Sequence, residues 1–123
     1  MDKPFVVKLK ELGAEPDAAL RRFAGNLELY RNFLSKFLDD DTIAEISLAL
    51  ETENWKKLLD TSHTLKGVAG NLGLTSLYDL SSQIVSALRG DDWETARAAC
   101  AVLEAEYQSV RASLGNALQE EPS

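Results

Sequence analysis

Apolar residues recur every three or four positions along most of the chain, and no stretch alternates strictly between apolar and polar positions as a half-buried strand does. This pattern predicts amphipathic helices. We expect a short helix over residues 16–23, followed by long helical segments over residues 26–51, 54–72, 75–90 and 91–116. The clearest stripe lies in the last segment, where the steps of three and four are typical of an antiparallel bundle: Trp93, Ala96, Cys100, Leu103, Tyr107, Val110 and Leu114.

Polar residues and glycines mark the ends of these segments. Asn26, Asn54 and Thr75 are suited to N-caps, because their side-chain oxygens can accept a hydrogen bond from the first helical turn. Gly73 and Gly90 follow the last apolar residue of their segments and are suited to ending a helix.

Three consecutive aspartates at positions 39–41 interrupt the first long segment. Residues 26–51 therefore form either one bent helix or two, and we favour one helix with a weak point at the aspartates. The fold class follows from the four long segments and their short turns: an all-α, up-and-down antiparallel four-helix bundle with a short extra N-terminal helix. We expect residues 1–15 to be a loosely attached lead-in or linker, residues 16–116 to be the bundle, and residues 117–123 to be a frayed tail.

Composition excludes several functions. The chain has 123 residues and a formal net charge of −7, which predicts one domain that binds no nucleic acid. No apolar run reaches the roughly 18–20 residues of a membrane span, so we expect no membrane insertion. The single cysteine, Cys100, excludes an internal disulfide, which favours a cytoplasmic protein, and we expect its side chain in the core. A monomer is the default expectation for the oligomeric state. One histidine and one cysteine do not make a zinc site, so neither a metal nor a cofactor is expected.

The only histidine of the chain is placed on an exposed helix face. At about 100° per residue, the apolar side of segment 54–72 must face the core, and His63 lies on the opposite side with Lys56 and Gly70. Leu59 lies at the boundary between the two sides. Gly67 follows His63 by one turn on the same exposed face, although glycine inside a helix costs roughly 0.5–1 kcal/mol relative to alanine. This indicates that another molecule must approach the helix closely beside His63.

A lysine completes the pattern. Lys66 is three residues after His63, so its ammonium can reach the same surface as the imidazole. Phosphoryl transfer is catalysed mainly by positioning and by neutralisation of charge. Alone, either residue would be an ordinary surface side chain; together with the glycine, they favour a surface that accepts a phosphoryl group.

The segment His-Thr-Leu-Lys-Gly-Val-Ala-Gly-Asn-Leu-Gly at residues 63–73 closely resembles the His-x-Leu-Lys-Gly…Gly signature of bacterial histidine-phosphotransfer (HPt) domains. The resemblance extends over about residues 17–115 and includes residues 19–26, Tyr30 and Asn54-Trp55. It implies a four-helix bundle in which His63 accepts a phosphoryl group from a receiver-domain aspartyl phosphate and passes it to another receiver. It further implies that Lys66 stabilises the group and that Gly67 gives access. From their places on or beside the exposed face of the same helix, we also expect Gly70, Leu59 and Lys56 in the docking surface.

The resemblance also implies a polar side chain, often glutamine, on the next helix near the histidine. Val85 stands at the position where that glutamine is expected, and Gln83 is two residues early. Ser82, Ser86 and Arg89 lie closer to the expected face, and Arg89 is the best candidate for a supporting cation.

Three functions compete. The first is a phosphocarrier without enzymatic turnover, whose partners are receiver domains of a hybrid sensor kinase or a response regulator, each bringing its own acidic pocket and Mg²⁺. The second is a non-catalytic helical adaptor, against which the spacing of His63, Lys66 and Gly67 argues. The third is an autonomous histidine kinase, against which we expect the length of 123 residues to argue, because it leaves no room for a nucleotide-binding lobe. Gly67, Gly70 and Gly73 do not form a phosphate loop, because they end a helix and follow no strand.

Overall fold

The computed structural model describes residues 4–119, and these residues form helices connected by short turns, with no strand among them. The all-α prediction is therefore confirmed. In chain order the helices are α1 (Pro4–Glu11), α2 (Pro16–Arg22), α3 (Leu27–Leu38), α4 (Thr42–Glu51), α5 (Trp55–Leu72), α6 (Thr75–Arg89) and α7 (Trp93–Gln119).

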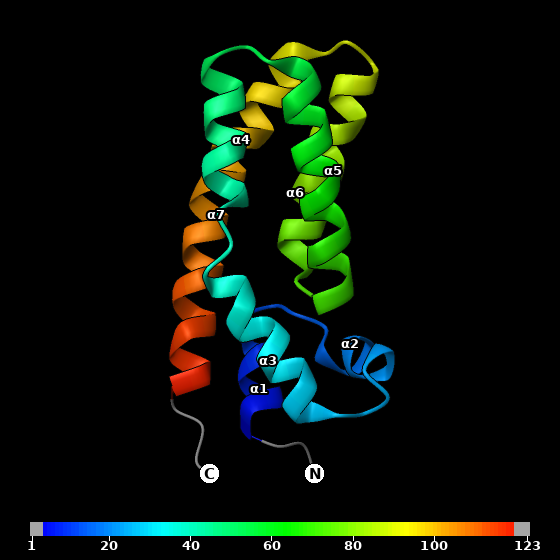
Figure 1. Ribbon diagram of the computed structural model, residues 1–123, viewed down its shortest axis with the longest axis vertical. Coiled ribbons are helices and arrows are strands. Elements are labelled where there is room, and N and C mark those ends of the chain that lie inside the picture. The colour runs from blue at the N-terminus through cyan, green and yellow to red at the C-terminus, as the bar shows by residue number, and fades with distance from the viewer. Residues whose placement is uncertain (1–3, 120–123) are drawn as a thin grey trace.

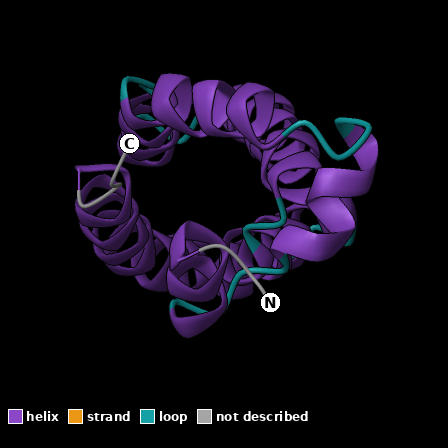
Figure 2. Cartoon of the chain, turned by 90° about the horizontal axis from the view of Figure 1, so that it is seen from below, coloured by secondary structure: helices purple, strands orange, loops and turns teal. Residues whose placement is uncertain are grey.

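Helix α7 is the longest element and connects the two halves of the molecule (Figure 1). Its 27 residues span about 40 Å at 1.5 Å per residue. One half of α7 packs against α4 and α6, and α5 packs against these same two helices to complete the up-and-down bundle; the other half of α7 packs alongside α1 and α3. Seen end-on in Figure 2, the helices surround a common axis. Apolar side chains form the core, among them Ile46, Leu58, Ile84 and Leu103.

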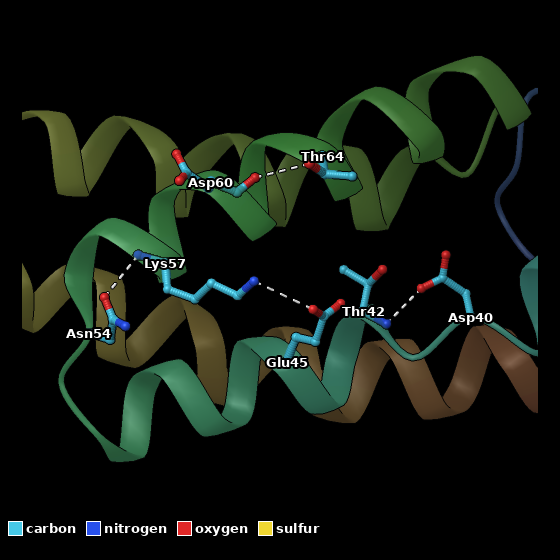
Figure 3. Close-up of polar contacts among 7 residues, drawn as sticks. All are labelled: Asp40, Thr42, Glu45, Asn54, Lys57, Asp60 and Thr64. Carbon is cyan, nitrogen blue, oxygen red and sulfur yellow. Dashed lines mark hydrogen bonds and ion pairs between the residues drawn. The ribbon is translucent and has the colours of Figure 1, made fainter.

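The first long segment is two helices, so the prediction of one helix over residues 26–51 is wrong. The break is held by Asp40. Its carboxylate accepts a hydrogen bond from the backbone N–H of Thr42 at 2.6 Å (Figure 3). Its backbone carbonyl accepts hydrogen bonds from Arg111 Nη2 at 2.9 Å and from the Tyr107 hydroxyl at 3.3 Å. These two donors come from α7, so a carbonyl freed from helical bonding is stabilised by a distant part of the chain.

The described residues nearest the two chain ends are helical, which differs from the prediction. Residues 4–11 form α1, and its apolar residues Phe5, Val6 and Leu9 are buried, so this part is not a loosely attached lead-in. The Arg31 guanidinium lies 4.4 Å from the centroid of the Phe5 ring, which connects α1 to α3. At the other end α7 continues past residue 116, and Ala117 is buried. The remainder of the expected lead-in and tail, residues 1–3 and 120–123, lies outside the described residues.

The helix that carries the histidine has the predicted ends. The Asn54 side chain accepts a hydrogen bond from the backbone N–H of Lys57 at 3.1 Å, as an N-cap does (Figure 3). Gly73 ends α5 in the left-handed conformation, with φ of 73°. The cap predicted for α6 is wrong by one residue: Leu74 occupies the N-cap position, and Thr75 is the first residue of the helix.

The two tryptophans, in the first turns of α5 and α7, meet at one end of the bundle. The Trp55 and Trp93 rings are stacked with their centroids 5.0 Å apart. On the side of α5 that faces α4, Lys57 forms an ion pair with Glu45 at 3.6 Å (Figure 3). Both side chains are about half exposed, so this pair contributes little stability.

Gly73→Ala is expected to destabilise the protein by roughly 2–4 kcal/mol. A Cβ atom at this position would lie 2.6 Å from the backbone oxygen of Glu15, and the φ of 73° strains any residue with a side chain. The Gly73 carbonyl also accepts a hydrogen bond from the Glu15 N–H at 2.8 Å, which holds the start of α2 against the end of α5. Urea unfolding should show the loss. Gly67→Ala is the matched control, because a Cβ there meets no atom within 4 Å; equal stability of the two variants would contradict this account.

Candidate functional site

His63 lies in the middle of α5 with its side chain exposed to solvent. Its neighbours Ser62 and Leu65 are buried, so the helix presents the imidazole on the side away from the core, as the apolar pattern predicted. Within residues 4–119, the His63 ring forms no hydrogen bond and no ion pair. The adjacent Thr64 hydroxyl, by contrast, donates a hydrogen bond to the backbone oxygen of Asp60 at 3.0 Å (Figure 3). Both ring nitrogens of His63 are therefore open to an approaching molecule.

A surface cleft of about 570 Å³ contains the histidine. Helix α5 contributes His63, Lys66, Gly67 and Gly70 to its wall. The start of α6 forms a second wall with Tyr78 and Asp79, and α2 with the residue before it forms a third wall with Glu15, Ala18 and Arg22. Three segments that are far apart in the sequence thus meet around one histidine.

The two glycines after His63 differ in their surroundings. A Cβ atom on Gly67 would meet nothing within 4 Å, so the surface beside the histidine is open there. A Cβ atom on Gly70 would lie 3.1 Å from Cδ2 of Tyr78. Gly70 therefore makes room for the Tyr78 ring and also lines the cleft.

The cations of the cleft are Lys66 and Arg22. Lys66 is half-buried, and its Nζ lies 5.8 Å from the centroid of the Tyr78 ring. Arg22 Nη1 donates a long hydrogen bond of 3.5 Å to the backbone oxygen of Asn71, which places the guanidinium near the C-terminal end of α5. Glu15 and Asp79 bring the opposite charge to the same cleft. Sequence reasoning missed Arg22 and Tyr78, since only the packing of α2 and α6 against α5 places them there.

The predicted supporting residues on α6 lie elsewhere. Ser82 and Ser86 line a separate groove together with Gln83 and the first residues of the α6–α7 connection, and Arg89 lines neither that groove nor the cleft. Val85, at the position expected for a glutamine, is buried.

The remaining predicted docking residues are on α5 but outside the cleft. Lys56 is exposed, and Leu59 is half-buried and packs against the core. Neither of them lines the cleft around His63.

Other reactive groups do not compete with this site. Cys100 is buried, as expected, and burial raises the pKa of its thiol to about 11, with a smaller contribution from Glu104. The thiol is therefore protonated and shielded near neutral pH. In the part of the chain that the structure describes, no cluster of three or more His, Cys, Asp or Glu side chains could hold a metal ion, and no helix is long and apolar enough to cross a membrane.

Comparison with known proteins gives a family. The chain matches no curated protein and no solved structure. Residues 19–113, which include most of α2 and all of α3 to α6, match the family described as the Hpt domain. Members of this family take part in histidine phosphotransfer as phosphocarriers rather than as catalytic enzymes, and they interact with receiver domains. Because this match covers most of the chain and agrees with the helical bundle around an exposed histidine, the protein belongs to the Hpt domain family of phosphorelay proteins.

Proposed function

We propose that His63 accepts the phosphoryl group from an aspartyl phosphate of one receiver domain and passes it to the aspartate of another. The observation that carries this proposal is that the only histidine of the chain is exposed, forms no hydrogen bond within residues 4–119, and lines a cleft together with a lysine. Receiver domains of a hybrid sensor kinase and of a response regulator are the partners that suit this role.

The transfer needs a nucleophile and an approach in line with the bond that breaks. A ring nitrogen of neutral His63 attacks the phosphorus, an N–P bond forms, and the aspartyl O–P bond breaks with its electron pair leaving on the carboxylate. The same steps in reverse load the next receiver. The open surface at Gly67 allows the receiver to bring its aspartate to the histidine, where reacting atoms must come within about 3–3.5 Å.

Charge is supplied from both sides of the complex. Lys66 brings a cation to the cleft that contains His63, and it offsets part of the negative charge on the transferred group. The receiver brings its own acidic pocket and Mg²⁺, so this chain needs only the nucleophile and the lysine.

The proposal is tested by incubating the full chain with a panel of receiver domains carrying labelled aspartyl phosphate, followed by peptide mapping under alkaline conditions. We expect acid-labile label on the peptide that contains His63, and no label when ATP alone is supplied. Binding of receivers without transfer of label would instead support the helical adaptor. Label from ATP alone would point to a kinase.

Lys66→Ala is expected to slow the transfer by about tenfold, because the loss of one charge contact to the transferred group costs on the order of 1–2 kcal/mol. The stability should change by no more than about 0.5 kcal/mol, since Lys66 forms no ion pair within the described residues. Lys57→Ala is the matched control: it removes the same charge from the same helix, on the side that faces Glu45 of α4. Equal slowing of transfer by the two variants would show that Lys66 acts only through net charge.

A further inference from the structure

The Lys66 ammonium lies over one aromatic side chain, Tyr78. Its Nζ lies 5.8 Å from the centroid of the Tyr78 ring, which is within the range of a cation–π interaction. Among residues 4–119 this is the only interaction of the ammonium, because Lys66 forms no ion pair and no hydrogen bond. Without the ring, a long side chain with four rotatable bonds would sample many positions in and outside the cleft.

The Tyr78 ring lies in space that is open because Gly70 of α5 has no side chain. It lies against Gly70, where a Cβ atom would be only 3.1 Å from Cδ2 and 3.4 Å from Cε2 of the ring. Tyr78 is 39% exposed, so the ring forms part of the cleft wall instead of the core. Gly70 thus provides the space for the Tyr78 ring, and the ring contacts Lys66, one turn before Gly70 on α5.

We propose that Tyr78 is a positioning residue for phosphoryl transfer, which keeps the Lys66 ammonium in the cleft beside His63. This inference rests on the proposed role of His63. A carboxylate partner would also hold the lysine, but it would neutralise the charge, occupy N–H donors and repel a phosphoryl group. The face of an aromatic ring attracts the cation through its quadrupole and leaves the charge and all three N–H donors available.

The experiment compares the wild-type protein with Tyr78→Leu and Tyr78→Phe, each with Lys66 and with Lys66→Ala. Tyr78→Leu should slow transfer from a phosphorylated receiver by about two- to fivefold, the value of an exposed cation–π interaction. Tyr78→Phe retains the ring and should rescue the rate. In the Lys66→Ala background, Tyr78→Leu should cause no further loss, because the residue acts through the lysine.

A second measurement requires no receiver. In NMR spectra of the free protein, the side-chain methylene protons of Lys66 should be shifted upfield by the ring current in the wild type and in Tyr78→Phe. The shift should be lost in Tyr78→Leu. If the wild type accepts no label on His63, the proposed function fails while this shift still reports on the ring. If the wild type is labelled but the shift is absent, only the role of Tyr78 fails.

Several outcomes would overturn the inference. Faster transfer by Tyr78→Leu would mean that the ring holds the lysine away from the reaction, and an equal loss with Lys66→Ala present would mean that Tyr78 only shapes the surface. A loss in Tyr78→Phe would assign the effect to the hydroxyl. Phe33→Leu is the matched control, because Phe33 is 43% exposed and has the Lys36 Nζ at 5.3 Å, outside this cleft. Equal slowing by that variant would indicate a general effect of surface aromatic residues.

Discussion

His63→Gln is expected to abolish acceptance of a phosphoryl group and to leave the fold unchanged. The side chain is exposed and forms no hydrogen bond or ion pair within the described residues, so its replacement should alter the free energy of unfolding by at most about 0.5 kcal/mol. Glutamine keeps a polar side chain of similar reach, but its amide nitrogen is not a nucleophile. The measurements are transfer of label from a phosphorylated receiver and thermal unfolding of the same protein.

The control for this prediction is the neighbouring hydroxyl. Thr64→Val removes a hydroxyl beside His63 that could accept a phosphoryl group. In the wild type this Thr64 hydroxyl donates a hydrogen bond to the backbone oxygen of Asp60. This variant should be labelled as the wild type is. Acid-labile labelling of His63→Gln at the wild-type level would show that the phosphoryl group is carried elsewhere, and the function proposed for His63 would be wrong.

Gly67→Gln is expected to slow transfer by about 100-fold, because a displacement of about 1 Å in the approach of the reacting atoms can cost that much. The site of the substitution is exposed, and the space that a Cβ would occupy contains no other atom. A glutamine side chain therefore fits the folded protein, but it extends into the space from which a receiver must approach His63. Transfer rates and urea unfolding should be measured on the same samples.

Gly67→Ala separates stability from function at the same position. It should stabilise the protein by about 0.5–1 kcal/mol through helix propensity and still transfer more slowly than the wild type. The rates should thus decrease from glycine to alanine to glutamine, while stability does not follow that order. Wild-type rates in Gly67→Gln would show that the receiver does not approach over this surface.

The local part of the fold was readable from the sequence. The apolar stripes predicted α5, α6 and α7, Asn54 and Gly73 marked the ends of α5, and the angular position of His63 on that helix predicted its exposure. Each of these features depends on residues within a few turns of one another. Helical periodicity encodes which face of a segment is apolar, and burial of that face then orients the opposite face toward solvent.

Features that depend on contacts between distant segments came only from the tertiary structure. The break between α3 and α4 is held by Tyr107 and Arg111 of α7, which bond to the Asp40 carbonyl 67 and 71 residues away in the chain. The position of α1, whose Phe5 and Leu9 are buried, likewise depends on packing against α2 and α7 and on the Arg31 guanidinium of α3 beside the Phe5 ring. Local pattern cannot predict either feature, because the stabilising groups lie on other helices.

The site divides in the same way. The sequence alone predicted His63, Lys66 and Gly67 as a group on one helix face, since they share one helix and Lys66 and Gly67 follow His63 by three and four residues. Only the packing of α6 against α5 brought Tyr78 to Lys66, and only the docking of α2 brought Arg22 to the cleft. The same packing left Ser82, Ser86 and Arg89 outside it. Spacing along one helix places side chains within a few ångströms of one another, whereas the register and rotation between helices are set by how all their side chains pack together.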